Sequence, residues 1–74
     1  MNLPENLVTT DPARMGGTPV FAGTRVPVRT LFDHLADSNG LEVFLEDFPT
    51  VTREQALAVI CIAGETVVAN ARAA

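Results

Sequence analysis

The sequence predicts a mostly α-helical domain in which an N-terminal β-hairpin precedes three helices. The first 27 residues combine short β-prone pieces with glycine and proline breaks. Two apolar stripes with helical spacing follow, and a capping box then opens a long segment without proline. With 74 residues the chain makes one domain, which we divide into a hairpin arm (1–27), three helices (28–70) and a tail (71–74).

The hairpin arm holds three β-prone pieces. Leu7–Thr10 is a strand candidate that ends at the Asp11-Pro12 break, and Val20-Phe21 and Thr24–Val26 follow. The connection Ala22-Gly23 suits a tight turn, because glycine reaches positive φ at little cost. We therefore expect residues 20–21 to pair with residues 24–26.

The glycines of this arm raise a second interpretation, a loop that binds phosphate. Such a loop needs glycines spaced so that successive N–H groups point at one oxyanion, before the start of a helix. Gly16, Gly17 and Gly23 lack that spacing, and Val20-Phe21 between them favour a strand. A structural hairpin is the better interpretation, and we expect no cofactor.

The first helix is expected over 28–37, opened by Pro27, since proline suits a first helical turn. Its apolar residues recur at helical spacing: Val28, Leu31, Phe32 and Leu35. The second helix is expected over 41–48 and ends at Pro49. Its stripe is Leu41, Phe44, Leu45 and Phe48.

Charged side chains occupy the other faces of these two helices: Asp33, Asp37, Glu42, Glu46 and Asp47. A paired-carboxylate or metal site would need such groups to be buried and converging. We interpret them as a solvated face, with His34 also facing solvent. The sequence assigns no catalytic and no metal-binding residue, so we do not expect an enzyme.

The third helix begins with a capping box, in which Thr52 and Gln55 satisfy each other's backbone N–H groups. A short helix, a tight turn at 49–51 and a capped helix form the outline of a helix-turn-helix. In that geometry Thr52, Arg53 and Gln55 meet the major groove, and Arg29 is a phosphate contact. Glu54 and the acidic second helix oppose this, so DNA binding and plain helix packing both remain open.

The third helix is apolar on most sides, since no charge falls within 56–64. We expect two roughly opposed stripes: Ala56, Ile60, Ala63 and Val67 on one, and Val59, Ile62 and Thr66 on the other. One of them would bind another chain, and the alternative is a helix wrapped by its own hairpin. The candidate interface residues are Val59, Ile62 and Val67, with Arg25 of the hairpin arm.

The net charge is −4, and all five positive side chains are arginines. This balance argues against nonspecific nucleic-acid binding and suits a basic partner. Cys61 is the single cysteine, which excludes an internal disulfide, and we interpret it as a core or interface filler. The first residues lack the pattern of a signal peptide, and the run 56–64 is short for a membrane span. We expect a cytoplasmic protein that does not bind membranes.

Several segments of the sequence, taken together, resemble one family. They are Gly17-x-Pro19-Val20-x-x-Gly23-Thr24-Arg25-Val26-Pro27-Val28, then Phe44-Leu45-Glu46-Asp47-Phe48-Pro49, then Thr52-Arg53-Glu54-Gln55-Ala56. With Leu31 and Leu35 between them, they are similar to the bacterial domain-of-unknown-function family 433 over about Leu7 to Gly64. The linker Ser38-Asn39-Gly40 departs from the commonest pattern of that family and changes a turn.

The resemblance implies a homodimeric, homeodomain-like helix-turn-helix domain with an N-terminal hairpin. It also implies a VapB-type antitoxin of a type II toxin–antitoxin module, which binds a PIN-like ribonuclease toxin and represses its own operon at operator DNA. An acidic antitoxin would occupy the toxin as a nucleic-acid mimic or anchor its apolar third helix in a groove. A DNA-binding regulator without a toxin and a homodimeric interaction module remain the alternatives.

Overall fold

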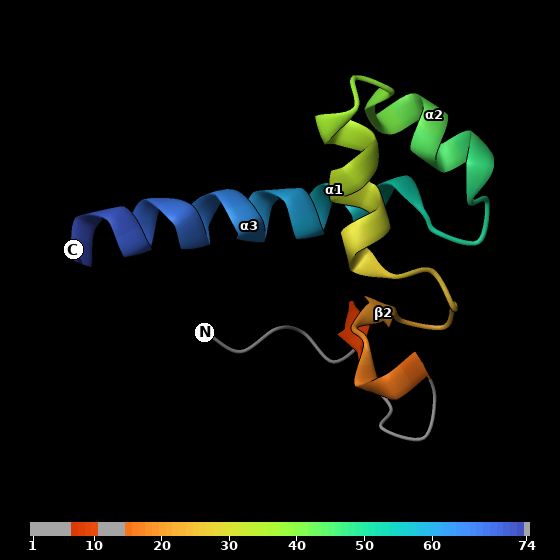
Figure 1. Cartoon of the computed structure of the whole chain (residues 1–74), viewed down its shortest axis with the longest axis horizontal. Helices are drawn as coiled ribbons and strands as arrows, with labels where there is room; N and C mark the ends of the chain where they lie inside the picture. The colour runs from red at the N-terminus through yellow and green to blue at the C-terminus, as the bar shows by residue number, and fades with distance from the viewer. Residues whose placement is uncertain (1–6, 11–14, 74) are drawn as a thin grey trace.

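A hairpin and three helices make up the computed structural model, which describes residues 7–10 and 15–73 (Figure 1). The Asp11-Pro12 break lies outside the described residues. The elements are β1 (Val8–Thr9), a short 3₁₀ turn η1 (Met15–Gly17), β2 (Val20–Phe21), α1 (Val28–Ala36), α2 (Gly40–Asp47) and α3 (Arg53–Ala73). The predicted class, a hairpin followed by three helices, is confirmed.

The hairpin pairs β1 with β2 in antiparallel register, with Val8 opposite Phe21 and Thr9 opposite Val20. The partner that we predicted for β2, residues 24–26, forms a tight turn instead of a strand. Within this turn the Thr24 hydroxyl donates to the Phe21 carbonyl at 2.8 Å and accepts from the Val26 N–H at 3.0 Å. Gly23 takes the positive φ of +76° that the sequence suggested.

A single bridge forms one residue beyond the predicted partner, between Val20 and Pro27. The Phe21 N–H donates to the Val26 carbonyl, and the Val28 N–H donates to the Pro19 carbonyl, both at 3.0 Å. Pro27 lacks an N–H, so the ladder ends there and the chain enters α1. The turn thereby fixes the start of α1 against the hairpin.

The core forms where α1, α2 and the start of α3 meet the hairpin. Phe21, Leu31 and Phe44 are fully buried, and the Phe21 and Phe44 rings lie 5.9 Å apart. Val51 and Ala56 close the core from the side of α3. The hairpin, α1 and α2 therefore cover one side of the first turns of α3, and Leu57 on the other side is 47% exposed.

A Schellman motif ends α1, because the Asn39 N–H donates to the His34 carbonyl and the Ser38 N–H to the Leu35 carbonyl. The residue at the left-handed position of this motif is Ser38, with φ +66°, where glycine is usual. Ser38, in the linker that departs from the family pattern, therefore adopts a backbone conformation that is unfavourable for serine.

The distal half of α3 extends away from the other elements, toward the left in Figure 1. Every residue from Gly64 to Arg72 is exposed, and Val67 and Val68 are 68% and 50% exposed. The helix continues to Ala73, so part of the expected tail (71–74) is helical. No described element covers this half of α3.

Candidate protein-interaction surfaces

The capping box at the start of α3 is confirmed. Its hydrogen bonds use the side chains of two candidate DNA-contact residues, Thr52 and Gln55. The Gln55 N–H donates to the Thr52 hydroxyl at 3.1 Å, and the Thr52 N–H donates to Gln55 Oε1 at 3.0 Å. Gln55 Nε2 donates to the Ala22 carbonyl at 3.2 Å. Both ends of the Gln55 amide are therefore used to fix α3 against the hairpin turn.

Arg53 also forms its hydrogen bonds within the chain. Its two terminal nitrogens donate to the two carboxylate oxygens of Glu42, each at 2.6 Å. These bonds lower the pKa of Glu42 and raise the pKa of Arg53. The planar fork that would read a guanine thus binds a carboxylate of α2.

Arg29 lies on another element, in the first turn of α1. Its side chain is 87% exposed and stands 3.9 Å from Asp33. The four candidate DNA contacts therefore differ: Thr52, Arg53 and Gln55 adjoin one another and bind within the chain, whereas Arg29 faces water.

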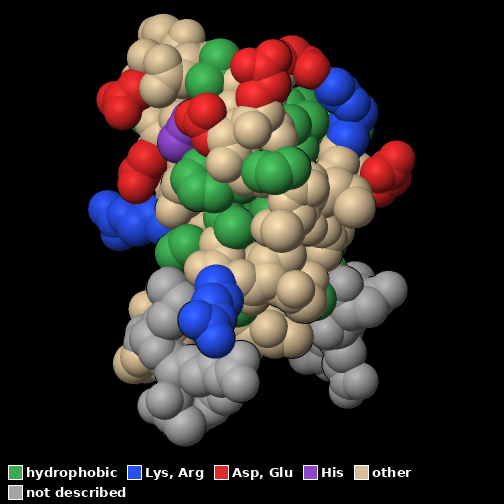
Figure 2. Space-filling model, turned by 90° about the vertical axis from the view of Figure 1, so that its right-hand side faces the viewer, with side chains coloured by type: hydrophobic (Ala, Val, Ile, Leu, Met, Phe, Trp, Pro, Cys, Tyr) green, Lys and Arg blue, Asp and Glu red, His purple; other side chains and the backbone are tan. Residues whose placement is uncertain are grey.

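The exposed carboxylates of α1 and α2 form what we call the acidic face: Asp33, Asp37, Glu42, Glu46 and Asp47. Figure 2 shows acidic side chains gathered over the upper part of the molecule, while the arginines stand apart from one another. Glu42 and Asp33 face arginines, but within the described residues Asp37 and Glu46 have no ion-pair partner. This face presents uncompensated negative charge.

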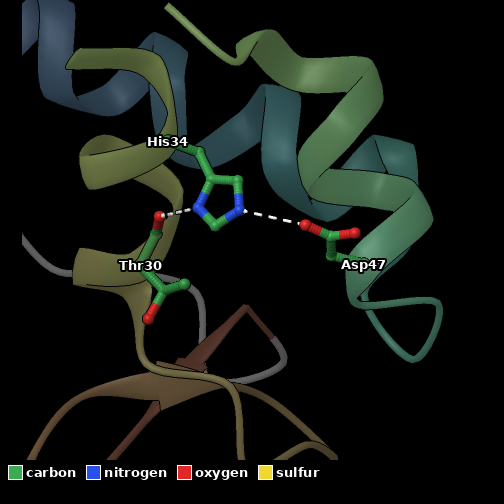
Figure 3. A network of polar contacts seen from close by, with 3 residues as sticks. All are labelled: Thr30, His34 and Asp47. Carbon is green, nitrogen blue, oxygen red and sulfur yellow. Dashed lines mark hydrogen bonds and ion pairs between the residues drawn. The ribbon is translucent and has the colours of Figure 1, made fainter. Parts of the chain in front are cut away.

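His34 lies between α1 and α2, and the expectation that it faces solvent is wrong. Its side chain is 18% exposed, and its ring stands nearly perpendicular to those of Phe44 and Phe48, with the ring centroids 5.6 Å apart in each pair. Nδ1 lies 3.0 Å from the Thr30 carbonyl and Nε2 lies 3.3 Å from Asp47 Oδ2 (Figure 3). Both partner atoms, a carbonyl oxygen and a carboxylate oxygen, are hydrogen-bond acceptors.

We interpret the contacts of His34 with Thr30 and Asp47 as part of the packing that holds α1 against α2. The packing of α1 against α2 turns His34 inward, since it lies one helical turn after Leu31. Among residues 7–10 and 15–73, no three His, Cys, Asp or Glu side chains are placed to hold a metal ion.

A groove runs between the hairpin turn and the α2–α3 connection. Its apolar lining includes Val26, Pro27 and Phe48, and threonines and the exposed Arg25 also line it. Arg25, a candidate partner contact from sequence, therefore lies at the edge of a concave surface.

The faces of α3 differ from those that we predicted. Val59 is 7% exposed and Ile62 packs against the core, so the body of the same chain covers both candidate interface residues. Ala56, which we assigned to the opposed stripe, is buried together with Val59, so the two predicted stripes do not separate an inner from an outer face. Val67, the third candidate, is exposed.

A different set of residues faces away from the body, and we call it the outer face of α3. It consists of Leu57, Cys61, Gly64, Val68 and Ala71, all exposed. Cys61 is thus not a core residue. The sequence signal for this face was the alternating spacing of four and three residues, which we did not use.

By length and composition α3 could cross a membrane. The segment Arg53–Arg72 has 20 residues and a mean hydropathy of 1.2, and 11% of its apolar window is buried. The charge-free run 56–64 is only part of this segment, so our expectation from that run did not include the longer apolar helix. Glu65 lies near the middle of this segment, where a charge is costly in lipid.

Comparison with known proteins gives a family without an assigned function. A relative from Sinorhizobium fredii (strain NBRC 101917 / NGR234), the uncharacterized protein y4eO, is 41% identical over 49 residues. The alignment covers 66% of this chain and 22% of the relative, so the chain spans less than a quarter of that protein. No solved structure matches. Residues 8–63 match the family described as "Protein of unknown function (DUF433)", and the chain belongs to that family.

Proposed function

We propose that this protein is the antitoxin of a type II toxin–antitoxin module, which neutralises a PIN-like ribonuclease in the cytoplasm by binding to it directly. The observation that carries the proposal is the acidic face on α1 and α2. A ribonuclease must attract a polyanion, so the surroundings of its active site tend to be basic. A folded acidic surface of matching extent would cover that region and exclude RNA.

The uncompensated carboxylates of this face support the proposal. Asp37 and Glu46 are free to pair with arginines or lysines of a partner, because no described residue binds them. Electrostatic complementarity of this kind accelerates association and selects the partner. The proposal therefore favours nucleic-acid mimicry over an apolar anchor as the way in which the toxin is bound.

The test is co-expression with the PIN-like ribonuclease that the resemblance places in the adjacent gene. We expect the two chains to co-purify and the growth defect caused by the ribonuclease to disappear. Glu46→Lys should weaken binding at least tenfold, whereas Glu54→Lys, the same change on α3, should not. The proposal fails if the chains do not associate, or if the neighbouring protein is harmless alone.

The Arg25 groove gives a second contact for the same partner. An exposed guanidinium beside Phe48 and Pro27 would bind a carboxylate next to an apolar side chain. We expect Arg25→Ala to retain the fold and lose affinity for the ribonuclease, measured by titration calorimetry. Unchanged affinity would remove Arg25 from the interface.

Operator binding is the weaker proposal. Thr52, Arg53 and Gln55 would have to exchange their contacts within the chain for base edges, and the acidic face opposes approach to DNA. Arg29 is the most accessible of the candidate phosphate contacts. A gel shift with the protein's own promoter at low salt, weakened by Arg29→Ala, would support operator binding, and no shift would reject it.

A further inference from the structure

We infer that the Arg25 groove is a peptide-binding site, which takes an extended segment of a partner in which an acidic and an apolar residue are two positions apart. The contact proposed above gives Arg25 one carboxylate partner. The geometry of the groove adds the conformation of the segment that carries this carboxylate and the spacing of its anchoring residues. The identity of the partner, the ribonuclease, rests on the proposed function.

The floor of the groove includes the outer side of the hairpin. Side chains alternate between the two sides of a strand, so Val20 lies on the opposite side from its neighbour Phe21, which is fully buried in the core. Val20 lines the groove together with Val26, Pro27 and Phe48. These four side chains form an apolar floor that can bury one apolar side chain of a ligand.

Charge complementarity selects an acidic occupant. Within the part of the chain that the structure describes, no carboxylate lines the groove, and the exposed Arg25 at its edge has no ion-pair partner. Asp47, next to Phe48 in the sequence, binds His34. One arginine binds one carboxylate with its planar fork, whereas binding of nucleic acid depends on several cations along the backbone. The groove therefore fits a peptide with a carboxylate better than a nucleic acid.

Threonine hydroxyls on the rim can bind the main chain of such a peptide. Thr9, Thr10 and Thr50 are exposed and line the groove, and Thr9 lies opposite Val20 in the hairpin. A hydroxyl donates to a carbonyl and accepts from an N–H, so it can bind either group of an extended backbone. Thr24 has another role, because its hydroxyl closes the hairpin turn. The rim thus offers contacts that do not depend on the sequence of the segment.

The spacing of the two anchoring residues follows from extended geometry. In a strand, residues two positions apart face the same side and lie about 7 Å apart, whereas adjacent residues face opposite sides. Arg25 and the apolar floor line one groove, so both anchors must face the same way. An acidic residue and an apolar residue two positions apart meet this condition, and adjacent ones do not.

The test is a titration of the whole protein with short blocked peptides, followed by two-dimensional NMR. Two probes carry the motif in its two directions, acetyl-Ser-Asp-Ser-Phe-Ser-amide and acetyl-Ser-Phe-Ser-Asp-Ser-amide, and the tighter binder becomes the reference. We expect saturable shift changes at millimolar peptide in the amides of residues 23–28 and 48–50. Making the two anchors adjacent should weaken binding about fivefold, because the ring leaves the floor. Replacing Asp with Asn should weaken it by a similar factor.

Two arginine variants make a matched pair. Arg25→Ala should lower the affinity for the reference peptide and remove its preference for Asp over Asn. Arg29→Ala removes another exposed arginine that does not line the groove, so it should leave both properties unchanged. Thr50→Trp places a large ring on the exposed rim, and it should block binding while the circular dichroism stays native.

Three results would overturn the inference. One is the absence of shift changes in residues 23–28 with both peptides. Another is an equal loss of affinity in Arg25→Ala and Arg29→Ala, which would indicate general electrostatic attraction. The third is tighter binding of oligothymidylate in the groove, which would make nucleic acid the occupant.

Failure of this inference is distinguishable from failure of the antitoxin proposal. If the ribonuclease binds Thr50→Trp as tightly as the native chain, the groove does not take its segment, and the inference fails while the antitoxin proposal stands. If the peptides bind as expected but the ribonuclease does not associate with the native chain, the antitoxin proposal fails and the peptide-binding site is supported.

Discussion

The two halves of α3 both carry large apolar residues, but their environments are opposite. In the first half, Ala56 and Val59 complete a core that the hairpin, α1 and α2 provide. In the second half, Val67 and Val68 are exposed and no other described element covers them. Hydrophobicity alone therefore does not decide which residues a small chain buries. The direction in which each residue faces from the helix, and the reach of the other elements, decide it.

A matched pair of valine substitutions tests whether the two halves of α3 differ in this way. Val59→Ala should lower the free energy of unfolding by about 2 kcal/mol, the loss expected for two buried methyl groups and a small cavity. Val68→Ala should change the stability of the monomer by less than about 0.5 kcal/mol. Urea unfolding at low protein concentration measures both.

Equal losses at the two positions would show that the distal half of α3 is packed within the monomer. Such a result would contradict the division of the helix that we describe.

The attachment of the first half depends on Gln55. Gln55→Ala should cost about 1–2 kcal/mol, because the capping box and the bond to the Ala22 carbonyl are lost together. Gln55→Glu keeps the acceptor for the Thr52 N–H but cannot donate to Ala22. It should therefore lose only part of that stability, and thermal unfolding of the two variants separates the two contributions.

The body itself contains a site that can be improved. Ser38→Gly should raise the free energy of unfolding by about 1 kcal/mol, since glycine adopts the left-handed conformation of this position without the cost that serine bears. Asn39→Gly, at the next position and without positive φ, serves as the control and should not stabilise. A destabilised Ser38→Gly variant would mean that the serine side chain has a role in the turn.

The smallest expected effect concerns the bond between Glu42 and Arg53 and its dependence on pH. Because Arg53 lowers the pKa of Glu42 in the fold, the pair contributes stability above the unfolded pKa of Glu42. That contribution disappears as the pH falls through the folded pKa. The difference in melting temperature between the native chain and Glu42→Gln should therefore be small at pH 7 and vanish in acid. A difference that grows on acidification would contradict the assigned contact.

Much of this architecture could be predicted from sequence, because local chemistry specifies it. The capping box, the proline at the start of α1 and the two apolar stripes gave helix bounds close to those of α1, α2 and α3. The partner of β2 was wrong, because the Thr24 hydroxyl closes a turn where a strand was expected. Side-chain pairs between elements, such as Arg53 with Glu42 or His34 with Asp47, depend on how the helices pack, and no local pattern contains them.

The candidate interface was harder to predict for a related reason. Periodicity identified α3 as apolar on most sides but did not indicate which side the body covers, so Val59 and Ile62 were assigned to a partner. Packing against Phe44 and Val51 decides the matter and leaves Leu57, Gly64 and Val68 outside.

The division of α3 into a covered first half and an exposed second half is tested most directly by amide hydrogen exchange of the native chain at low protein concentration. We expect the amides of residues 56–62 to exchange slowly and those of residues 65–72 to exchange much faster, because the body stabilises only the first half of the helix. Equal protection over both halves would contradict this division.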